Sequence, residues 1–150
     1  MAEKSETVAV AEKLVVSRAF PARPELVFDC WLNPEAARRW LFAAPGGEMV
    51  RAEIDARVGG RFIFTDRRDG EDVEHVGEYL EIERPRRLVF TFGVPKYSPV
   101  MTRVTIDIAP AATGCNLTLT HEGVLPEWFE QTRSGWTAIL NALAESLPTS

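Results

Sequence analysis

The sequence predicts an α+β domain in which a curved antiparallel sheet is covered by one long C-terminal helix. The first observation is a series of segments between Gly59 and Gly123 in which apolar and polar residues alternate as in strands. The second is an amphipathic segment from Pro126 to Leu147 with an apolar stripe at helical spacing. Because the apolar face of such a sheet has to be buried, we expect the helix to cover it.

The N-terminal third predicts one strand followed by two helices. A strand is expected at 14–20, where apolar residues occupy alternate positions. A first helix begins at Pro24, and Asn33 caps a second helix whose first residue is again a proline. Two glycines, Gly46 and Gly47, then break the chain. The apolar faces of the two helices comprise Val27, Phe28, Trp31, Leu32, Ala37, Trp40 and Leu41.

Six further strands are expected before the last helix. The turn Arg68-Asp69-Gly70 contains the Asp-Gly pair that is typical of a tight hairpin, and Gly114 lies in the turn of the last hairpin. The order of elements is therefore β-α-α-β6-α. It forms one domain over residues 1–150 with an ordered core of about 12–147. The expected strands are residues 49–54, 61–66, 73–82, 87–92, 101–108 and 116–121.

Composition excludes several classes of function. Hydrophobic residues make up 45% and charged residues 26% of the chain, a balance typical of globular proteins. The net charge of -5 argues against nucleic-acid binding, which needs a basic face. No apolar run is long enough to span a membrane, and residues 1–7 are too polar for a signal peptide, so a cytoplasmic location is expected. Cys30 and Cys115 are expected to be buried free thiols, and no metal or cofactor is expected because the His and Cys residues lack ligand spacing.

A series of short motifs resembles a known family from about residue 14 to residue 147. These motifs are Phe20-Pro21, Val27-Phe28 with Trp31, Asn33-Pro34-Glu35 with Trp40, Gly59-Gly60-Arg61-Phe62, Gly77-Glu78-Tyr79-Leu80-Glu81-Ile82, Arg87-Leu88-Val89-Phe90-Thr91-Phe92, Leu117-Thr118-Leu119-Thr120-His121 and Gly135-Trp136. The series is similar to the Hsp90-ATPase-activator-homologue (AHSA1-like) branch of the START-like, or SRPBCC, superfamily. The resemblance implies the helix-grip (START/Bet v 1-like) fold and an interior pocket that takes apolar small molecules. The family is named after a co-chaperone of Hsp90, so an Hsp90-type chaperone is a candidate partner. In that co-chaperone the similar domain is one of two, and only one is recognised in this sequence, which argues against co-chaperone activity.

We therefore expect a binding protein that holds an apolar or aromatic small molecule between the sheet and the C-terminal helix. One alternative is an enzyme of the cyclase or hydrolase type, which would need His121, Tyr79 or Arg103 to converge in the cavity. Another is an interaction module for a chaperone or regulator, which would need an exposed apolar patch. No residue is assigned a catalytic role. The candidate pocket-lining residues are Trp40, Phe64, Tyr79, Phe90, Phe92, Met101, Arg103, His121, Trp128, Phe129, Thr132 and Trp136.

Five polar or unusual positions need separate interpretation. By alternation His121 points toward the helix, either as a satisfied histidine at the core edge or as a polar group for a ligand. His75 is expected to be exposed near a hairpin tip, and Arg61 and Arg103 are expected to form surface salt bridges. Gly135 costs about 1 kcal/mol relative to alanine in a helix interior. That cost predicts the close approach of a side chain, a backbone segment or a ligand, with a helix kink as the competing explanation.

Overall fold

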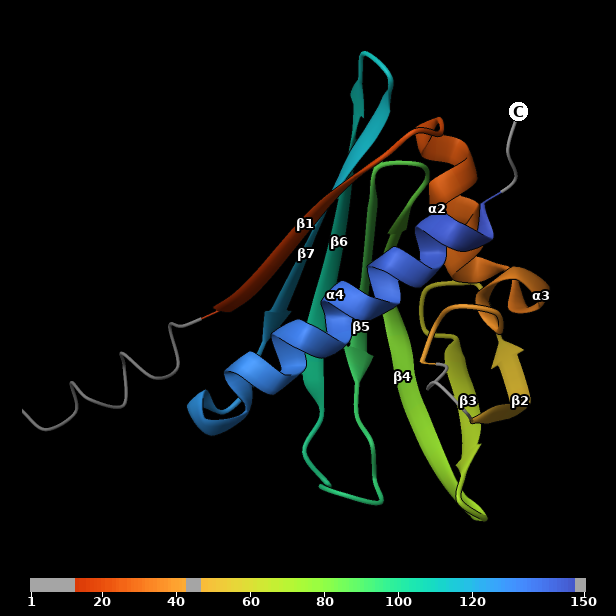
Figure 1. Ribbon diagram of the computed structural model, residues 1–150, viewed down its shortest axis with the longest axis vertical. Helices are drawn as coiled ribbons and strands as arrows, with labels where there is room; N and C mark the ends of the chain where they lie inside the picture. Colours follow the sequence, from red (N-terminus) through yellow and green to blue (C-terminus); the bar gives the residue numbers. More distant parts are fainter. Residues whose placement is uncertain (1–12, 43–46, 148–150) are drawn as a thin grey trace, which may run out of the picture.

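The computed structural model describes residues 13–42 and 47–147, and its elements follow one another in the predicted order (Figure 1). Two predictions fall on residues outside the described ranges: the polar segment 1–7, and Gly46 of the glycine pair that breaks the chain. None of the helices in the described ranges is long and apolar enough to cross a membrane. The elements are β1 (Lys13–Phe20), α2 (Pro24–Leu32), α3 (Pro34–Ala37), β2 (Glu48–Ile54), β3 (Arg61–Arg68), β4 (Glu71–Glu83), β5 (Arg87–Phe92), β6 (Thr102–Ala111), β7 (Gly114–Glu122), the 3-10 turn η1 (Pro126–Trp128) and α4 (Phe129–Ser146).

The seven strands form one open antiparallel sheet in the order β1-β7-β6-β5-β4-β3-β2. The first strand of the chain pairs with the last along its whole length, from Lys13 opposite Glu122 to Phe20 opposite Cys115. This pairing leaves β1 and β2 as the two edges. An open antiparallel sheet of this kind with a C-terminal helix is consistent with the helix-grip fold.

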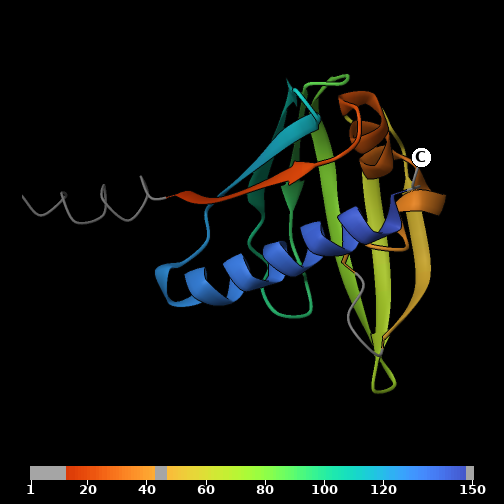
Figure 2. The same ribbon diagram turned by 45° about the horizontal axis from the view of Figure 1, so that its top comes forward.

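Helix α4 crosses one face of the sheet, as Figures 1 and 2 both show. Its buried residues are Trp136, Leu140 and Leu143, which lie on one side of the helix because they are spaced by four and three residues. Arg133 donates from Nη1 to the carbonyl oxygen of Val15 at 2.8 Å, which ties the helix to edge strand β1. The apolar stripe of the sequence is therefore the face that α4 turns toward the sheet.

Local interactions and backbone geometry explain where helices α3 and α4 begin. The Oδ1 atom of Asn33 accepts hydrogen bonds from the backbone N–H groups of Glu35 and Ala36 at 2.9 and 3.3 Å, so the predicted cap of α3 is confirmed. The last helix begins later than predicted, since residues 126–128 form a 3-10 turn and the α-helix starts at Phe129. Trp128 has φ -105° and ψ 1°, which interrupts regular α geometry at the junction.

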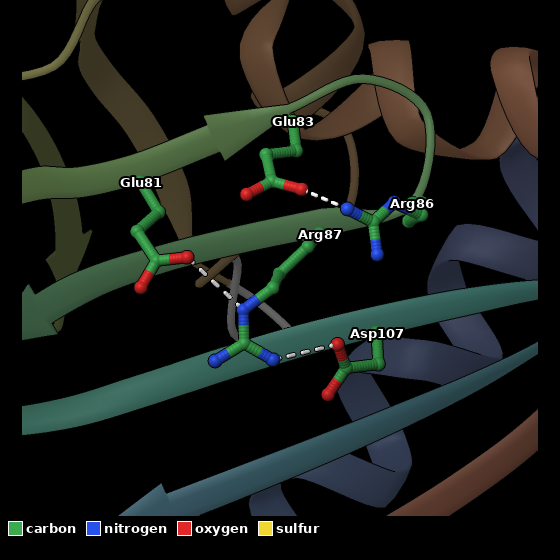
Figure 3. A network of polar contacts seen from close by, with 5 residues as sticks. All are labelled: Glu81, Glu83, Arg86, Arg87 and Asp107. Carbon is green, nitrogen blue, oxygen red and sulfur yellow. Dashed lines mark hydrogen bonds and ion pairs between the residues drawn. The ribbon is translucent and has the colours of Figure 1, made fainter.

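The face of the sheet that points away from α4 carries a charged network (Figure 3). Arg87 of β5 donates to Glu81 of β4 at 3.1 Å and to Asp107 of β6 at 2.9 Å, so one guanidinium joins three neighbouring strands. Arg86 pairs with Glu83 across the adjoining turn. Because these groups are one-third or more exposed, each pair contributes about 1 kcal/mol or less. This part of the outer face is a solvated, charged surface.

Candidate ligand-binding pocket

A pocket of about 580 Å³ lies between α4, strands β3 to β5 and the segment that follows α3. Most of its lining is aliphatic or aromatic, with Arg39, Arg68, His75 and Thr132 as its polar side chains. Such a volume and such a mixture are typical of small-molecule sites. The lining residues from outside α4 are Arg39, Trp40, Phe42, Arg68, His75, Phe92 and Val94, and those from α4 are Thr132, Gly135, Trp136, Ala138, Ile139 and Ala142.

Three nearly parallel rings form one wall of this pocket, which we call the aromatic wall: Phe42, His75 and Phe92. The Phe42 ring centroid lies 4.7 Å from that of His75 at an interplanar angle of 8°, and 5.0 Å from that of Phe92 at 12°. Trp136 of α4 approaches Phe42 at 5.9 Å with its plane inclined by 61°. Because Phe42 and His75 are almost fully buried, a flat ligand can reach this wall mainly at the partly buried ring of Phe92, with the indole of Trp136 inclined beside it.

Phe42 holds its place in the aromatic wall at a conformational cost. Its φ of 60° lies in the left-handed region, which a bulky side chain rarely adopts. Such a conformation costs about 1–3 kcal/mol and persists only where the surroundings fix it. Here the ring is 4% exposed and is stacked on two others, so packing supplies the compensation. Sequence analysis missed Phe42 as a pocket residue because no local pattern signals this backbone conformation.

His75 is buried, so the prediction that it is exposed near a hairpin tip was wrong. It lies opposite Phe64 in the register of β3 and β4, on the inward face, and the ring of Phe42 covers it. Its Nδ1 lies 3.4 Å from the carbonyl oxygen of Phe64, which can only accept, so Nδ1 donates this weak hydrogen bond. Burial, assisted by the charge of Arg68, lowers the pKa of His75 to about 4. The ring is therefore neutral at pH 7.

His121 is held by protein groups at both ring nitrogens. Trp136 donates from Nε1 to Nδ1 at 3.0 Å, so Nδ1 is the unprotonated nitrogen. The other nitrogen, Nε2, then donates to the Oγ1 atom of Thr102 at 2.7 Å, and that hydroxyl donates to the carbonyl oxygen of Phe92 at 2.9 Å. Burial lowers the pKa of His121 to about 4. These contacts favour the interpretation of His121 as a satisfied core histidine that fixes the orientation of Trp136.

Four of the expected pocket residues line this pocket: Trp40, Phe92, Thr132 and Trp136. Phe64 is fully buried behind the aromatic wall, with its ring 5.7 Å from that of Phe42. The other members of the expected set lie elsewhere, as described next.

Tyr79 and Phe90 border a separate void of only about 10 Å³, too small for any ligand. Burial raises the pKa of the Tyr79 hydroxyl. Phe129 is partly buried at the start of α4, whereas Trp128 is 49% exposed and lies outside the pocket lining. The expected set was therefore a mixture of pocket, core and surface residues.

Met101 and Arg103 lie away from the pocket lining and are exposed. Arg103 alternates with the buried Val104 on β6 and therefore points to the opposite face of the sheet. His121, Tyr79 and Arg103 do not converge, so the polar cluster that the enzyme alternative required is not formed by these three. Neither Arg61 nor Arg103 forms an ion pair with any residue in the described ranges, so the predicted salt bridges were wrong.

Gly135 lines the pocket, but no protein atom crowds it. A Cβ atom built at this position would have nothing within 4 Å outside its own helix neighbourhood. The predicted close approach of a side chain or backbone segment was therefore wrong. Gly135 is exposed, and it leaves open space at the pocket rim.

Asp66 and Arg68 are functional candidates that sequence analysis missed, although their signal was present. In β3 the even-numbered positions face inward, beginning with the buried Phe62 and Phe64, so Asp66 and Arg68 continue the same face. Arg68 donates from Nε to Oδ2 of the fully buried Asp66 at 2.5 Å. Strand alternation alone could have placed this ion pair beside the pocket.

A larger groove, of about 810 Å³, lies over β2 to β5 and is bordered by Met101. Charged residues of both signs, Glu53, Glu78 and Arg61, line it, mostly from the outward positions of the strands. This is a poorer environment for an apolar molecule than the pocket with the aromatic wall. We therefore regard the smaller pocket as the candidate site.

The described part of the chain offers no evident metal centre. It contains no group of three or more His, Cys, Asp or Glu side chains that could hold a metal ion. Cys30 and Cys115 are buried free thiols, as predicted, and burial raises the pKa of both.

Comparison with known proteins agrees with the architecture. A profile of the family described as activator of Hsp90 ATPase homolog 1-like protein matches residues 21–147. No curated protein matches the chain. A crystal structure from Chromobacterium violaceum is 28% identical, with a TM-score of 0.84 over 92% of this chain and 98% of that one.

Two more distant structures support the fold alone. The solution structure of an AHSA1-like protein from Aeromonas hydrophila is 21% identical, with a TM-score of 0.77 over 90% of this chain and 91% of that one. A protein of unknown function from Staphylococcus aureus is 15% identical, with a TM-score of 0.79 over 90% of this chain and 92% of that one.

Proposed function

We propose, from the premise that this chain belongs to the family of activator of Hsp90 ATPase homolog 1-like proteins, that it binds a small apolar or aromatic molecule. The observation that carries the proposal is the 580 Å³ pocket between α4 and the sheet, with its aromatic wall. In this proposal the sheet and α4 grip the ligand from two sides. We also propose that the protein has a single domain and is cytoplasmic.

The energetics of such a site favour a flat ligand. A bicyclic aromatic molecule that buries about 250 Å² of apolar surface gains about 6 kcal/mol from the hydrophobic effect. Stacking on the partly buried ring of Phe92 adds about 1 kcal/mol. The indole of Trp136 is already fixed by its hydrogen bond to His121, so little side-chain entropy is lost on binding. These gains total about 7 kcal/mol before the cost of association is subtracted, so the affinity is expected to be no tighter than the micromolar range.

A neutral probe tests this function. We expect 2-naphthamide to bind with a Kd in the micromolar range and to shift the NMR signals of Trp136, Phe92 and His75 together. The substitution Ala142→Phe places a ring where the pocket is lined by a methyl group, and we expect it to weaken binding at least tenfold.

Thr137→Phe is the matched control, since Thr137 is an exposed position of the same helix outside the pocket lining. It should leave the affinity unchanged. Shifts confined to exposed residues such as Arg57, or equal affinities of the two variants, would contradict binding in this pocket.

A second candidate function is the stimulation of an Hsp90-type chaperone, which the family description names. The observation that favours it is a group of exposed apolar side chains at the β5–β6 connection: Tyr97, Val100 and Met101, which are 68%, 61% and 46% exposed. If this function is correct, the protein should raise the ATP hydrolysis rate of a purified Hsp90, and Tyr97→Ser with Val100→Ser should abolish the effect. An unchanged hydrolysis rate with the native chain would dismiss it.

A further inference from the structure

We propose that the ligand of this pocket is a carboxylate, whose anionic group is bound by Arg39 and Arg68 while its apolar part lies against the aromatic wall. This inference rests on the proposed function and narrows the class of ligand. We call these two residues the rim arginines.

The charges that line the pocket are all of one sign. The chain as a whole has more acidic than basic residues, 22 against 17. Among the described residues, the only formally charged side chains in the pocket lining are the rim arginines. His75 adds no charge at pH 7, because burial holds its pKa at about 4. The rim arginines would attract an anion, and the described lining contains no carboxylate that would repel it.

Arg68 is oriented by a buried carboxylate and keeps donors for a ligand. Its Nε atom donates to Asp66 at 2.5 Å, and Asp66 is fully buried. The side chain of Arg68 is 37% exposed, and no residue in the described ranges accepts from its two terminal nitrogens. A guanidinium held through Nε still presents those nitrogens, which match the two oxygens of a carboxylate.

Arg39 supplies a second cation from a different element. It directly precedes the fully buried Trp40, which anchors the segment, while Arg39 itself is exposed. Across the described part of the chain its guanidinium has no hydrogen-bond acceptor and no ion-pair partner. Asp66 offsets the charge of Arg68, so the three groups together carry one net positive charge, which a bound carboxylate would neutralise.

The test compares two probes that share a ring system and differ in charge, 2-naphthoate and 2-naphthamide. We expect 2-naphthoate to bind about tenfold more tightly, since charge-assisted hydrogen bonds are about twice as strong as neutral ones. Raising the salt concentration from about 0.02 to 0.5 M should weaken the naphthoate only.

Variants identify the groups responsible. Arg39→Gln should weaken naphthoate binding about threefold, and Arg68→Lys, which keeps a cation beside Asp66, about fivefold, because each removes charge-assisted donors. Neither should change naphthamide binding by more than about twofold. Arg61→Gln is the charge-matched control, because Arg61 is exposed on another groove, and it should change neither affinity.

The outcomes separate the two proposals. Equal binding of both probes, or an equal loss of naphthoate affinity in the Arg61→Gln variant, would overturn the carboxylate inference and leave the pocket as a neutral apolar site. Binding of neither probe would overturn the proposed function, and the carboxylate inference with it.

Discussion

Acidification from pH 7 to pH 4 is expected to remove most of the stability of the fold, because two buried histidines resist protonation. Burial lowers the pKa of both His75 and His121 from 6.5 to about 4. Above pH 6.5 both rings are neutral in the folded and unfolded chains, and stability is at its full value. Between pH 6.5 and about 4 the unfolded chain takes up protons that the folded chain does not, so stability falls. Below about pH 4 the folded chain takes them up too, and the loss from these groups stops.

The expected size of this effect is large. A pKa difference of this magnitude corresponds to about 3 kcal/mol of folding free energy for each ring. Two such losses are comparable to the total stability of a typical domain, about 5–15 kcal/mol. At His75 the charge of Arg68 lowers the pKa further while that of Asp66 opposes it, whereas at His121 burial alone is responsible.

Urea unfolding followed by circular dichroism at pH 7.5, 6.0 and 5.0 measures this loss directly. His121→Gln retains an acceptor for the Trp136 indole and a donor for Thr102, and His75→Phe retains the stack on Phe42. Neither variant titrates in this range, so each should halve the pH dependence. The chain has only these two histidines, and the double variant should show almost none. A native protein equally stable at pH 7.5 and pH 5.0 would refute the assigned burial of both rings.

Periodicity was sufficient to predict the elements of the fold. The alternation of Phe62 and Phe64 in β3, and the spacing of Trp136, Leu140 and Leu143 in α4, are local patterns with one low-energy solution. The cap at Asn33 was predictable for the same reason, since its partners lie two and three residues away.

The pocket was only partly predictable, because its wall is assembled from distant segments. Thr132 and Trp136 belong to the helical stripe and could be assigned from it. The position of Phe42 depends on a left-handed backbone conformation and on rings from β4 and β5, none of which is a local property. His75 was judged exposed because it lies near a hairpin tip, although it shares its side of β4 with the buried Val73 and Tyr79.

Arg103 illustrates a different kind of error. The buried residues Val104, Ile106 and Ile108 fix the inward positions of β6 as even-numbered, which puts Arg103 on the outer face. The same rule applied to β3 identifies Arg68 as inward. The sequence therefore contained the direction of each side chain. The odd or even position of a polar residue relative to its buried strand neighbours has to be checked before that residue is assigned to a site.

Replacing Gly77 by alanine should destabilise the fold by about 3 kcal/mol, since it forces atoms into a packed sheet. Gly77 lies on the inward face of β4, where a Cβ atom would come within 1.9 Å of the carbonyl oxygen of Thr91 and 2.5 Å of the Phe62 ring. The neighbouring backbone is irregular, since the register of β4 and β5 shifts between Tyr79 and Glu81, and the N–H of Glu78 donates to Oγ1 of Thr91 at 2.9 Å. Backbone oxygen cannot move aside cheaply, so the strands would have to separate.

Gly135→Ala is the matched control, since it adds the same methyl group at a position with nothing within 4 Å. There the helix should gain up to about 1 kcal/mol, because alanine replaces glycine in the interior of α4. The free energies of urea unfolding of the two variants should therefore move in opposite directions, and a Gly77→Ala chain that fails to fold agrees with this expectation. A loss below about 1 kcal/mol at Gly77, or a loss of any clear size at Gly135, would mean that the packing at these two positions differs from that described. The two substitutions add the same methyl group, so the opposite signs of the stability changes would come from the different room available at Gly77 and Gly135.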